Sequence, residues 1–160
     1  VLSRLIPVGG NRFDEAIINK IKKDMNFVIG EKSAEAIKKN IASAYATDAQ
    51  MDICGRNLVT GLPSEITVTG ECVHEALAEL VQSIVDSIKI ILERTPPEIS
   101  SDIYKSGLYL TGGSSRIQHL GQFIYDELGL KVNLCEEPES TVIMGLGAVI
   151  EDPQLAKLAL

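Results

Sequence analysis

Tryptophan is absent from this chain, and aromatic residues of any kind make up only 4% of its 160 residues. Aromatic platforms on which unpaired bases could stack are therefore few, which argues against a single-strand nucleic-acid binder. Positive charge is also in deficit, because 15 lysines and arginines face 22 aspartates and glutamates, for a net charge of −7. Such a surface repels a phosphate backbone, so we expect no nucleic-acid partner.

Signals of location are missing as well. No apolar run approaches the roughly 18 residues of a membrane span, and no signal peptide opens the chain, so we expect a soluble, cytoplasmic protein. The cysteines are Cys54, Cys72 and Cys135. Three widely spaced cysteines predict buried free thiols in a reducing compartment.

Patterns that would mark a catalytic or metal site are not found either. The sequence has no G-x-x-x-x-G-K-[ST], G-x-G-x-x-G or H-E-x-x-H pattern. The two histidines, His74 and His119, are expected to be surface or capping residues. We therefore predict no catalytic residue and no metal ligand in this chain.

What the sequence does contain is a globular composition. Apolar residues make up 45% of the chain, and a chain of about this length buries roughly 68 to 70% of the surface that its unfolded form exposes. The first residue is Val1 and not methionine, and a strand-like run extends from it to Val8. We expect the sequence to be a piece of a longer protein.

Three stretches have apolar residues at helical spacing. The first starts at Asn11 and includes Phe13, with Asn11 and Asp14 resembling a cap followed by an acidic first turn. A second amphipathic helix should follow Gly30. The third and longest runs from about residue 71 to residue 94 and ends before two prolines.

Strand patterns separate and follow these helices. Residues 51–69 alternate around Gly61-Leu62-Pro63, which predicts a β-hairpin in a small lobe. Further on, strands are expected at 107–111 and 131–135, with a helix over 115–128 between them. The nearly all-apolar stretch 141–150 predicts a buried helix. The order of elements predicts an α/β fold.

Two local features are candidate binding elements. The turn Gly112-Gly113-Ser114 lies between a predicted strand and a predicted helix, where a phosphate or nucleotide can be bound, although an ordinary serine-capped loop has the same pattern. Glu35 and Lys38 lie three residues apart on one helix face, where a carboxylate could bind ribose hydroxyls; by pattern alone, a solvated surface ion pair is the more common explanation, since Glu35 also lies four residues before Lys39. Gly9-Gly10 reads most simply as a turn that brings a strand and a helix close together.

Five stretches together resemble the MreB family of bacterial actin homologues, in order and in spacing. They are VGGNRFDEAIINKI (8–21), IGEKSAEAIKKNIASAY (29–45), GRNLVTGLP (55–63), PPEISSDI (96–103) and GLYLTGG (107–113). The resemblance covers nearly the whole chain and matches the second half of such proteins. It implies the second half of an actin-like ATPase domain of the ribonuclease H-like kind. A larger α/β subdomain (1–20 and 75–160, IIA-like and truncated at its N-terminus) would carry a smaller inserted α+β subdomain (21–74, IIB-like).

The resemblance also assigns an adenosine site by position. Residues matching the family's ribose- and adenine-facing turn are Glu35, Ala36, Ile37 and Lys38. Residues matching its adenosine loop are Gly112, Gly113, Ser114 and Ser115. The stretch Gly-Ser-Ser-Arg-Ile is more similar to heat-shock chaperones of the same fold, in which the matching arginine stacks on adenine, so Arg116 joins the predicted site.

The resemblance implies a function as well. The longer protein would be an ATPase that forms head-to-tail filaments under the membrane, controls rod shape and works with the wall-synthesis machinery. ATP is the implied cofactor; Mg²⁺, the hydrolytic residues and the membrane contact would belong to the missing half, so this piece alone should not hydrolyse ATP. Two alternatives stay open: the nucleotide-binding part of a chaperone-type ATPase of the same fold, and a non-enzymatic interaction module.

Overall fold

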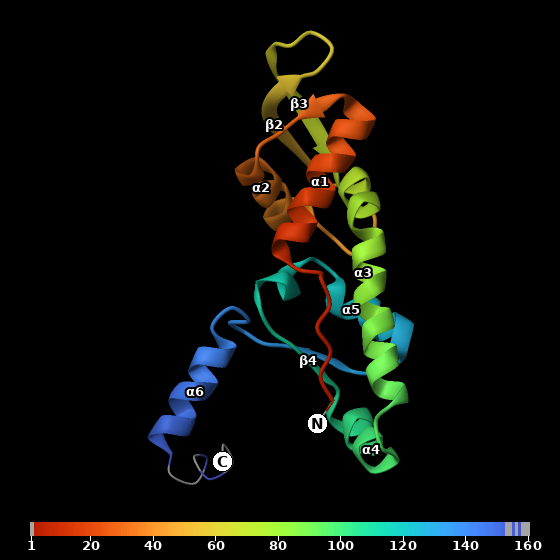
Figure 1. Ribbon diagram of the computed structural model, residues 1–160, viewed down its shortest axis with the longest axis vertical. Coiled ribbons are helices and arrows are strands. Elements are labelled where there is room, and N and C mark those ends of the chain that lie inside the picture. The colour runs from red at the N-terminus through yellow and green to blue at the C-terminus, as the bar shows by residue number, and fades with distance from the viewer. Residues whose placement is uncertain (1, 153–154, 156, 158–160) are drawn as a thin grey trace.

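The computed structural model describes residues 2–152, 155 and 157 and shows an elongated molecule with a hairpin at one end (Figure 1). In chain order the elements are α1 (Gly10–Met25), β1 (Phe27–Val28), α2 (Glu31–Ile41), β2 (Gln50–Asn57), β3 (Pro63–Thr69), α3 (Gly70–Glu93), α4 (Pro97–Ser106), β4 (Leu108–Leu110), the 3-10 turn η1 (Gly113–Arg116), α5 (Leu120–Leu128), β5 (Val132–Leu134) and α6 (Thr141–Glu151). The strands form a three-stranded and a two-stranded sheet.

The three-stranded sheet is antiparallel in the order β1-β2-β3. The β2–β3 register pairs Ile53 with Ile66, both apolar. β1 pairs with the end of β2. Close to this pairing, a side chain at Gly55 would collide with Phe27, because a Cβ at position 55 would lie 2.4 Å from the phenylalanine ring. The absence of a side chain at Gly55 thus lets the sheet close over a fully buried ring.

Three helices pack beside this sheet and form most of the core. α1 lies against both α2 and α3. Each contributes one apolar stripe at helical spacing, which is why their sequences alternate apolar and charged residues. The fully buried members of these stripes include Phe13, Ile17, Ile21, Ile37, Leu77, Val81 and Val85.

The two-stranded sheet lies toward the other end of the molecule. β4 and β5 are parallel, with Leu108 opposite Val132, and α5 is the crossover between them. This unit joins the first one through backbone hydrogen bonds between Gln118 and the residues after α2: Gln118 N–H donates to Ala42 O, and Ala44 N–H donates to Gln118 O.

Most sequence expectations about elements are confirmed. The helices from residue 10, after Gly30 and over 70–93 are present, and so are the hairpin and both later strands. Thr69 caps α3, since its hydroxyl accepts a hydrogen bond from Cys72 N–H. Repeating apolar residues thus predict local structure well wherever a stripe is buried.

Several expectations about elements are wrong. Residues 2–8 form no strand, and Val1 lies outside the described residues. The expected helix over 115–128 begins only at Leu120, because η1 ends at Arg116, Gln118 forms a β-bridge with Ser43, and His119 has a left-handed backbone. One helix, α4, follows residue 96 without having been predicted, with a proline in its first turn, where the missing N–H costs nothing. Gly9 occupies the cap position of α1, so Asn11 is not its cap.

Expectations about burial also need correction. α6 is exposed on every side, with Ile143 71% and Ile150 83% exposed, although its sequence is nearly all apolar. Burial requires a partner, and α6 packs closely against no other described element. The cysteines are not buried: Cys54 is exposed, and Cys72 and Cys135 are partly exposed.

No helix among the described residues is long and apolar enough to cross a membrane. The division into one subdomain of residues 1–20 and 75–160 and another of residues 21–74 stays a prediction.

Candidate functional site

In α2, Glu35 and Lys38 lie outside the buried apolar stripe of the helix. Ala34, Ile37 and Ile41 form that stripe. Because that buried stripe fixes the rotation of the helix, Glu35 lies on its exposed side, with 50% of its side chain exposed, and Lys38 lies at the edge of the stripe, with 15% exposed. The sequence of α2 therefore determines where these two polar groups lie.

The glycine turn after β4 has a backbone that only glycine adopts readily. Gly112 has φ of 84°, in the left-handed region. Its N–H donates to Pro138 O at 2.6 Å, and its carbonyl accepts from the hydroxyl of Ser115 at 2.7 Å. The Thr111 hydroxyl also donates to Pro138 O, at 2.9 Å. The turn is thus fixed between its own serine and the loop that precedes α6.

One pocket of about 740 Å³ lies between α2 and this turn. Its lining residues are Gly10, Glu35, Lys38, Lys39, Gly113, Ser114, Arg116, Ile117 and Glu139. Its volume falls within the range of about 300 to 1,000 Å³ that is common for small-molecule sites. Two segments that are far apart in the sequence therefore share one cavity.

Ion pairs surround the pocket. Lys39 Nζ lies 2.7 Å from Glu35 Oε1. The hydrogen bond from Lys39, followed by its charge, lowers the pKa of Glu35, and the same bond raises the pKa of Lys39. Glu35 is therefore ionised at neutral pH, and its second oxygen can accept hydrogen bonds from a ligand.

Lys38 is tied to α1 on the same side of the pocket. Its ammonium donates to Asp14 Oδ2 at 2.9 Å and to Gly10 O at 3.2 Å. Both side chains of the pair are mostly buried, with 15% and 16% of their surface exposed. Lys38 is thus held more tightly than an ordinary surface lysine.

Arg116 lies on the turn's side of the pocket, with Nε 3.4 Å from Glu139 Oε1. Both side chains are well exposed, at 60% and 62%. An exposed pair of this kind contributes little to stability and breaks easily. Arg116 is therefore available to a ligand once Glu139 releases it.

The structure brings together five of the nine residues predicted from the sequence. Glu35, Lys38, Gly113, Ser114 and Arg116 line the pocket. The other four do not line it: Ile37 is fully buried in the core, Ser115 is nearly so, and Ala36 and Gly112 are partly exposed. The binding roles of all nine stay predictions.

Four lining residues were not predicted. Gly10, Lys39, Ile117 and Glu139 reach the pocket through tertiary packing. Glu139 is there because Pro138 O is bonded to Thr111 and Gly112. Only Lys39 had a local signal, its i,i+4 spacing from Glu35.

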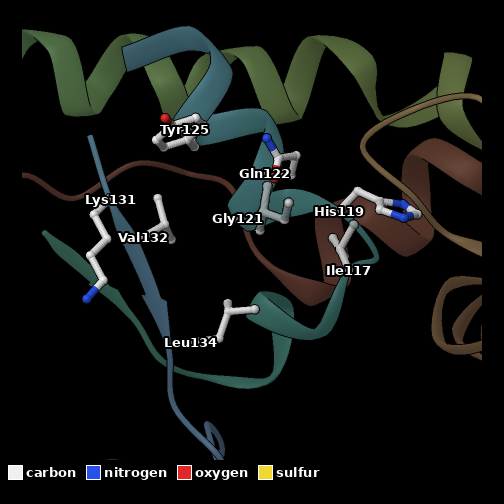
Figure 2. Close-up of a pocket in the computed structure, with 9 residues that line it drawn as sticks. Ile117, His119, Gly121, Gln122, Tyr125, Lys131, Val132 and Leu134 are labelled. Carbon is white, nitrogen blue, oxygen red and sulfur yellow. The ribbon is translucent and has the colours of Figure 1, made fainter. Parts of the chain in front are cut away.

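A second pocket of about 460 Å³ lies between α5 and β5 (Figure 2). Val132 and Leu134 line one side, and Gly121 and Gln122 of α5 line the other. Lys131 supplies the one ammonium group in the lining of this second pocket, and the glycine turn after β4 does not line it. Its chemistry suits an apolar group better than a nucleotide.

No group of three or more histidines, cysteines, aspartates and glutamates within the described part of the chain is arranged to hold a metal ion. The two carboxylates of the larger pocket face lysine and arginine partners instead.

Comparisons with known structures define the class of fold. A chain of the MamK double helical filament matches with a TM-score of 0.70 at 24% identity, over 82% of this chain and 41% of that one. MreB5 of Spiroplasma citri in its ADP-bound crystal structure matches with a TM-score of 0.89 at 34% identity, over 93% of this chain and 46% of that one. The fold is thus the actin-like α/β fold expected from the sequence.

Sequence comparison places the chain more narrowly. The family model described as MreB/Mbl protein matches residues 1–158. The cell shape-determining protein MreB of Escherichia coli K12 is 39% identical over 153 residues, which cover 94% of this chain and 44% of that protein. This chain belongs to the MreB/Mbl family, as the five sequence stretches indicated, and it spans about half the length of the curated relatives it matches.

Proposed function

We propose that this chain binds the adenosine part of ATP within a filament-forming cell-shape protein. The observation that carries the proposal is the shared pocket: residues of α2 and residues of the glycine turn, more than 70 positions apart in sequence, line one cavity of about 740 Å³. The relative MreB5 crystallised with ADP has the same fold over 93% of this chain.

The residues of the pocket suit this ligand. Glu35 offers a carboxylate oxygen to ribose hydroxyls, and Lys38 offers an N–H donor. Gly113 leaves room for a base to approach the backbone, and the Arg116 guanidinium can stack on a purine in place of its contact with Glu139. Because the pocket combines acceptors, donors and one planar cation, it fits a nucleoside better than a bare phosphate.

The remaining parts of the function would require a longer protein, because in the relatives the matching region is only part of the chain. ATP would bridge both halves, with Mg²⁺ and the hydrolytic residues on the other half. ATP-bound subunits would stack head to tail in the cytoplasm and guide wall synthesis at the membrane, with the membrane contact on the other half. The two subdomains (1–20 with 75–160, and 21–74) would supply one longitudinal surface.

Titration of the full-length protein with a fluorescent ATP analogue tests the adenosine site. We expect saturable binding that Glu35→Ala weakens about 10- to 150-fold, the loss typical of hydrogen bonds to a charged group. Glu31→Ala, an exposed residue on the same helix outside the pocket, is the matched control and should bind like the wild type.

Two results would count against the proposal. A lack of any saturable signal favours the interaction-module alternative, and a Glu35→Ala affinity equal to that of the control removes Glu35 from the site. Phosphate release by the isolated 160-residue chain above the buffer rate would contradict the placement of hydrolysis on the other half. The chaperone alternative rests on Gly112 to Ile117 alone, and the MreB/Mbl match over residues 1–158 favours the filament protein.

A further inference from the structure

The Lys38 ammonium is held by two groups of a neighbouring helix. It donates to the carboxylate of Asp14 at 2.9 Å and to the Gly10 carbonyl at 3.2 Å, both on α1. A lysine ammonium has three N–H donors. Two of them are used by α1, and the third remains for a ligand in the pocket that Lys38 lines.

Stability alone is a poor explanation for this ion pair. Asp14 keeps its other oxygen, Oδ1, buried and without a hydrogen-bond partner among the described residues. A buried carboxylate that is only half satisfied costs desolvation energy, and replacing such a pair with apolar residues is often neutral or stabilising. The fold therefore tolerates a cost at Asp14 that packing does not offset.

The space around the ammonium is also closely fitted. A Cβ at Gly10 would lie 3.4 Å from Lys38 Nζ, at the tight end of ordinary contact. Gly10 itself lines the pocket. The first turn of α1 thus surrounds the ammonium with a carboxylate, a carbonyl and a backbone without a side chain.

We infer that Asp14 is a positioning residue: it holds the Lys38 ammonium at the wall of the pocket so that one N–H is aimed at the bound nucleoside. This inference rests on the proposed adenosine site and deepens it. Asp14 does not line the pocket and does not touch the ligand; it acts through Lys38. An oriented donor binds more tightly than a mobile one because less side-chain entropy is lost on binding.

The test is a double-mutant cycle in the full-length protein, with uncharged adenosine and a fluorescent ATP analogue as probes. Asp14→Asn keeps the shape of the side chain and removes its charge, so it should weaken adenosine binding about 3- to 10-fold. In a Lys38→Met background the same substitution should change the affinity less than about 2-fold, because the residue it positions is gone. Glu15→Gln, an exposed residue of the same helix, is the matched control and should bind both probes like the wild type.

The outcomes separate the two proposals. A wild type that binds neither probe overturns the adenosine site and this inference with it. A wild type that binds, with Asp14→Asn unchanged, overturns this inference alone. An equal loss in both backgrounds also overturns it, because a merely structural Asp14 would weaken binding whether or not Lys38 is present. In the supporting case, the Lys38 ammonium gives a protected NMR signal in the wild type that Asp14→Asn removes.

Discussion

The two ends of the molecule differ in how they bury apolar residues. Around α1, α2, α3 and the three-stranded sheet, apolar stripes meet one another and are almost all buried. After Val85, the only buried hydrophobic residues of the described chain are Ile117, Leu120 and Ile124. α4 and α6 have no buried residue at all.

The difference shows that an apolar sequence predicts burial only where a second element faces it. α6 has a higher proportion of apolar residues than α1, yet α1 buries Phe13, Ile17 and Ile21 whereas α6 buries no residue. Parallel sheets are normally covered by helices on both faces. The parallel sheet of this second region has only two strands, and α6 buries no residue against another element. Stability should therefore be concentrated in the first region, and substitutions in the two regions should differ accordingly.

The largest effect should come from Phe27, which is fully buried beneath the sheet. Phe27→Ala should lower the free energy of unfolding of the 160-residue chain by about 3 to 5 kcal/mol, because it leaves a cavity the size of a ring. Urea denaturation followed by circular dichroism measures it. A loss below about 1 kcal/mol would show that the first region is loosely packed.

Gly55 provides a smaller effect in the same region. Gly55→Ala should cost about 1 to 3 kcal/mol, because its methyl group would lie 2.4 Å from both the Phe27 ring and the carbonyl oxygen of Val28. Gly145→Ala in α6 is the control, since nothing lies within 4 Å of that position, and it should stabilise the chain slightly. The comparison between the regions fails if the two substitutions have effects of the same sign and size in the same denaturation experiment.

One link between the regions depends on pH. The Tyr45 hydroxyl, beyond the end of α2, donates to Asp126 Oδ2 of α5 at 2.5 Å, and this bond, with burial and the charge of Asp126, raises the pKa of Tyr45 to about 12. Because the neutral phenol makes the bond, its contribution is complete below about pH 10, the ordinary pKa of tyrosine, and is lost as the pH rises from there toward 12.

The melting temperature of the wild type should therefore fall across that pH window more steeply than that of Tyr45→Phe, which cannot make the bond. Parallel curves for the two proteins would show that the link carries no stability. The control is Tyr104→Phe in α4, whose exposed ring should leave the slope unchanged.

The smallest effect should come from the exposed face of α6. Ile143→Ser removes an apolar side chain that is 71% exposed, so the free energy of unfolding of the 160-residue chain should change by less than about 0.5 kcal/mol. The same urea experiment applies. A loss as large as that of a core substitution would mean that α6 is packed in solution and would remove the contrast between the regions.

Local patterns predicted most of the helices, the hairpin strands and the two parallel strands, because each depends on the spacing of apolar residues over a short stretch of sequence. α4 was missed although Pro97 at its start and Gly107 after its end are ordinary helix boundaries. β1 has only two residues and no pattern of its own. The exposure of α6 depends on distant elements and leaves no trace in its own sequence.

The candidate site divides in the same way. The sequence marked Glu35, Lys38 and the glycine turn as separate weak signals, and only the family resemblance placed them at one ligand. The pairing of Lys38 with Asp14 could not be predicted, because the two residues lie 24 positions apart on different helices. The sequence pattern instead suggests Asp14 as an acidic first-turn residue after an Asn11 cap, although the first turn of α1 contains no acidic residue.

α3 contacts both ends of the molecule: it packs against α1 and β3 near its start and against α5 farther along (Figure 1). Its 24 residues form one continuous helix, which at about 1.5 Å per residue is about 36 Å long. A tilt of about 5° at one end would displace the other by about 3 Å by the same geometry. Because Lys89 on this helix also pairs with Glu127 of α5 at 3.1 Å, α3 can act as a lever that passes small rotations from the hairpin end to the strands beside the glycine turn.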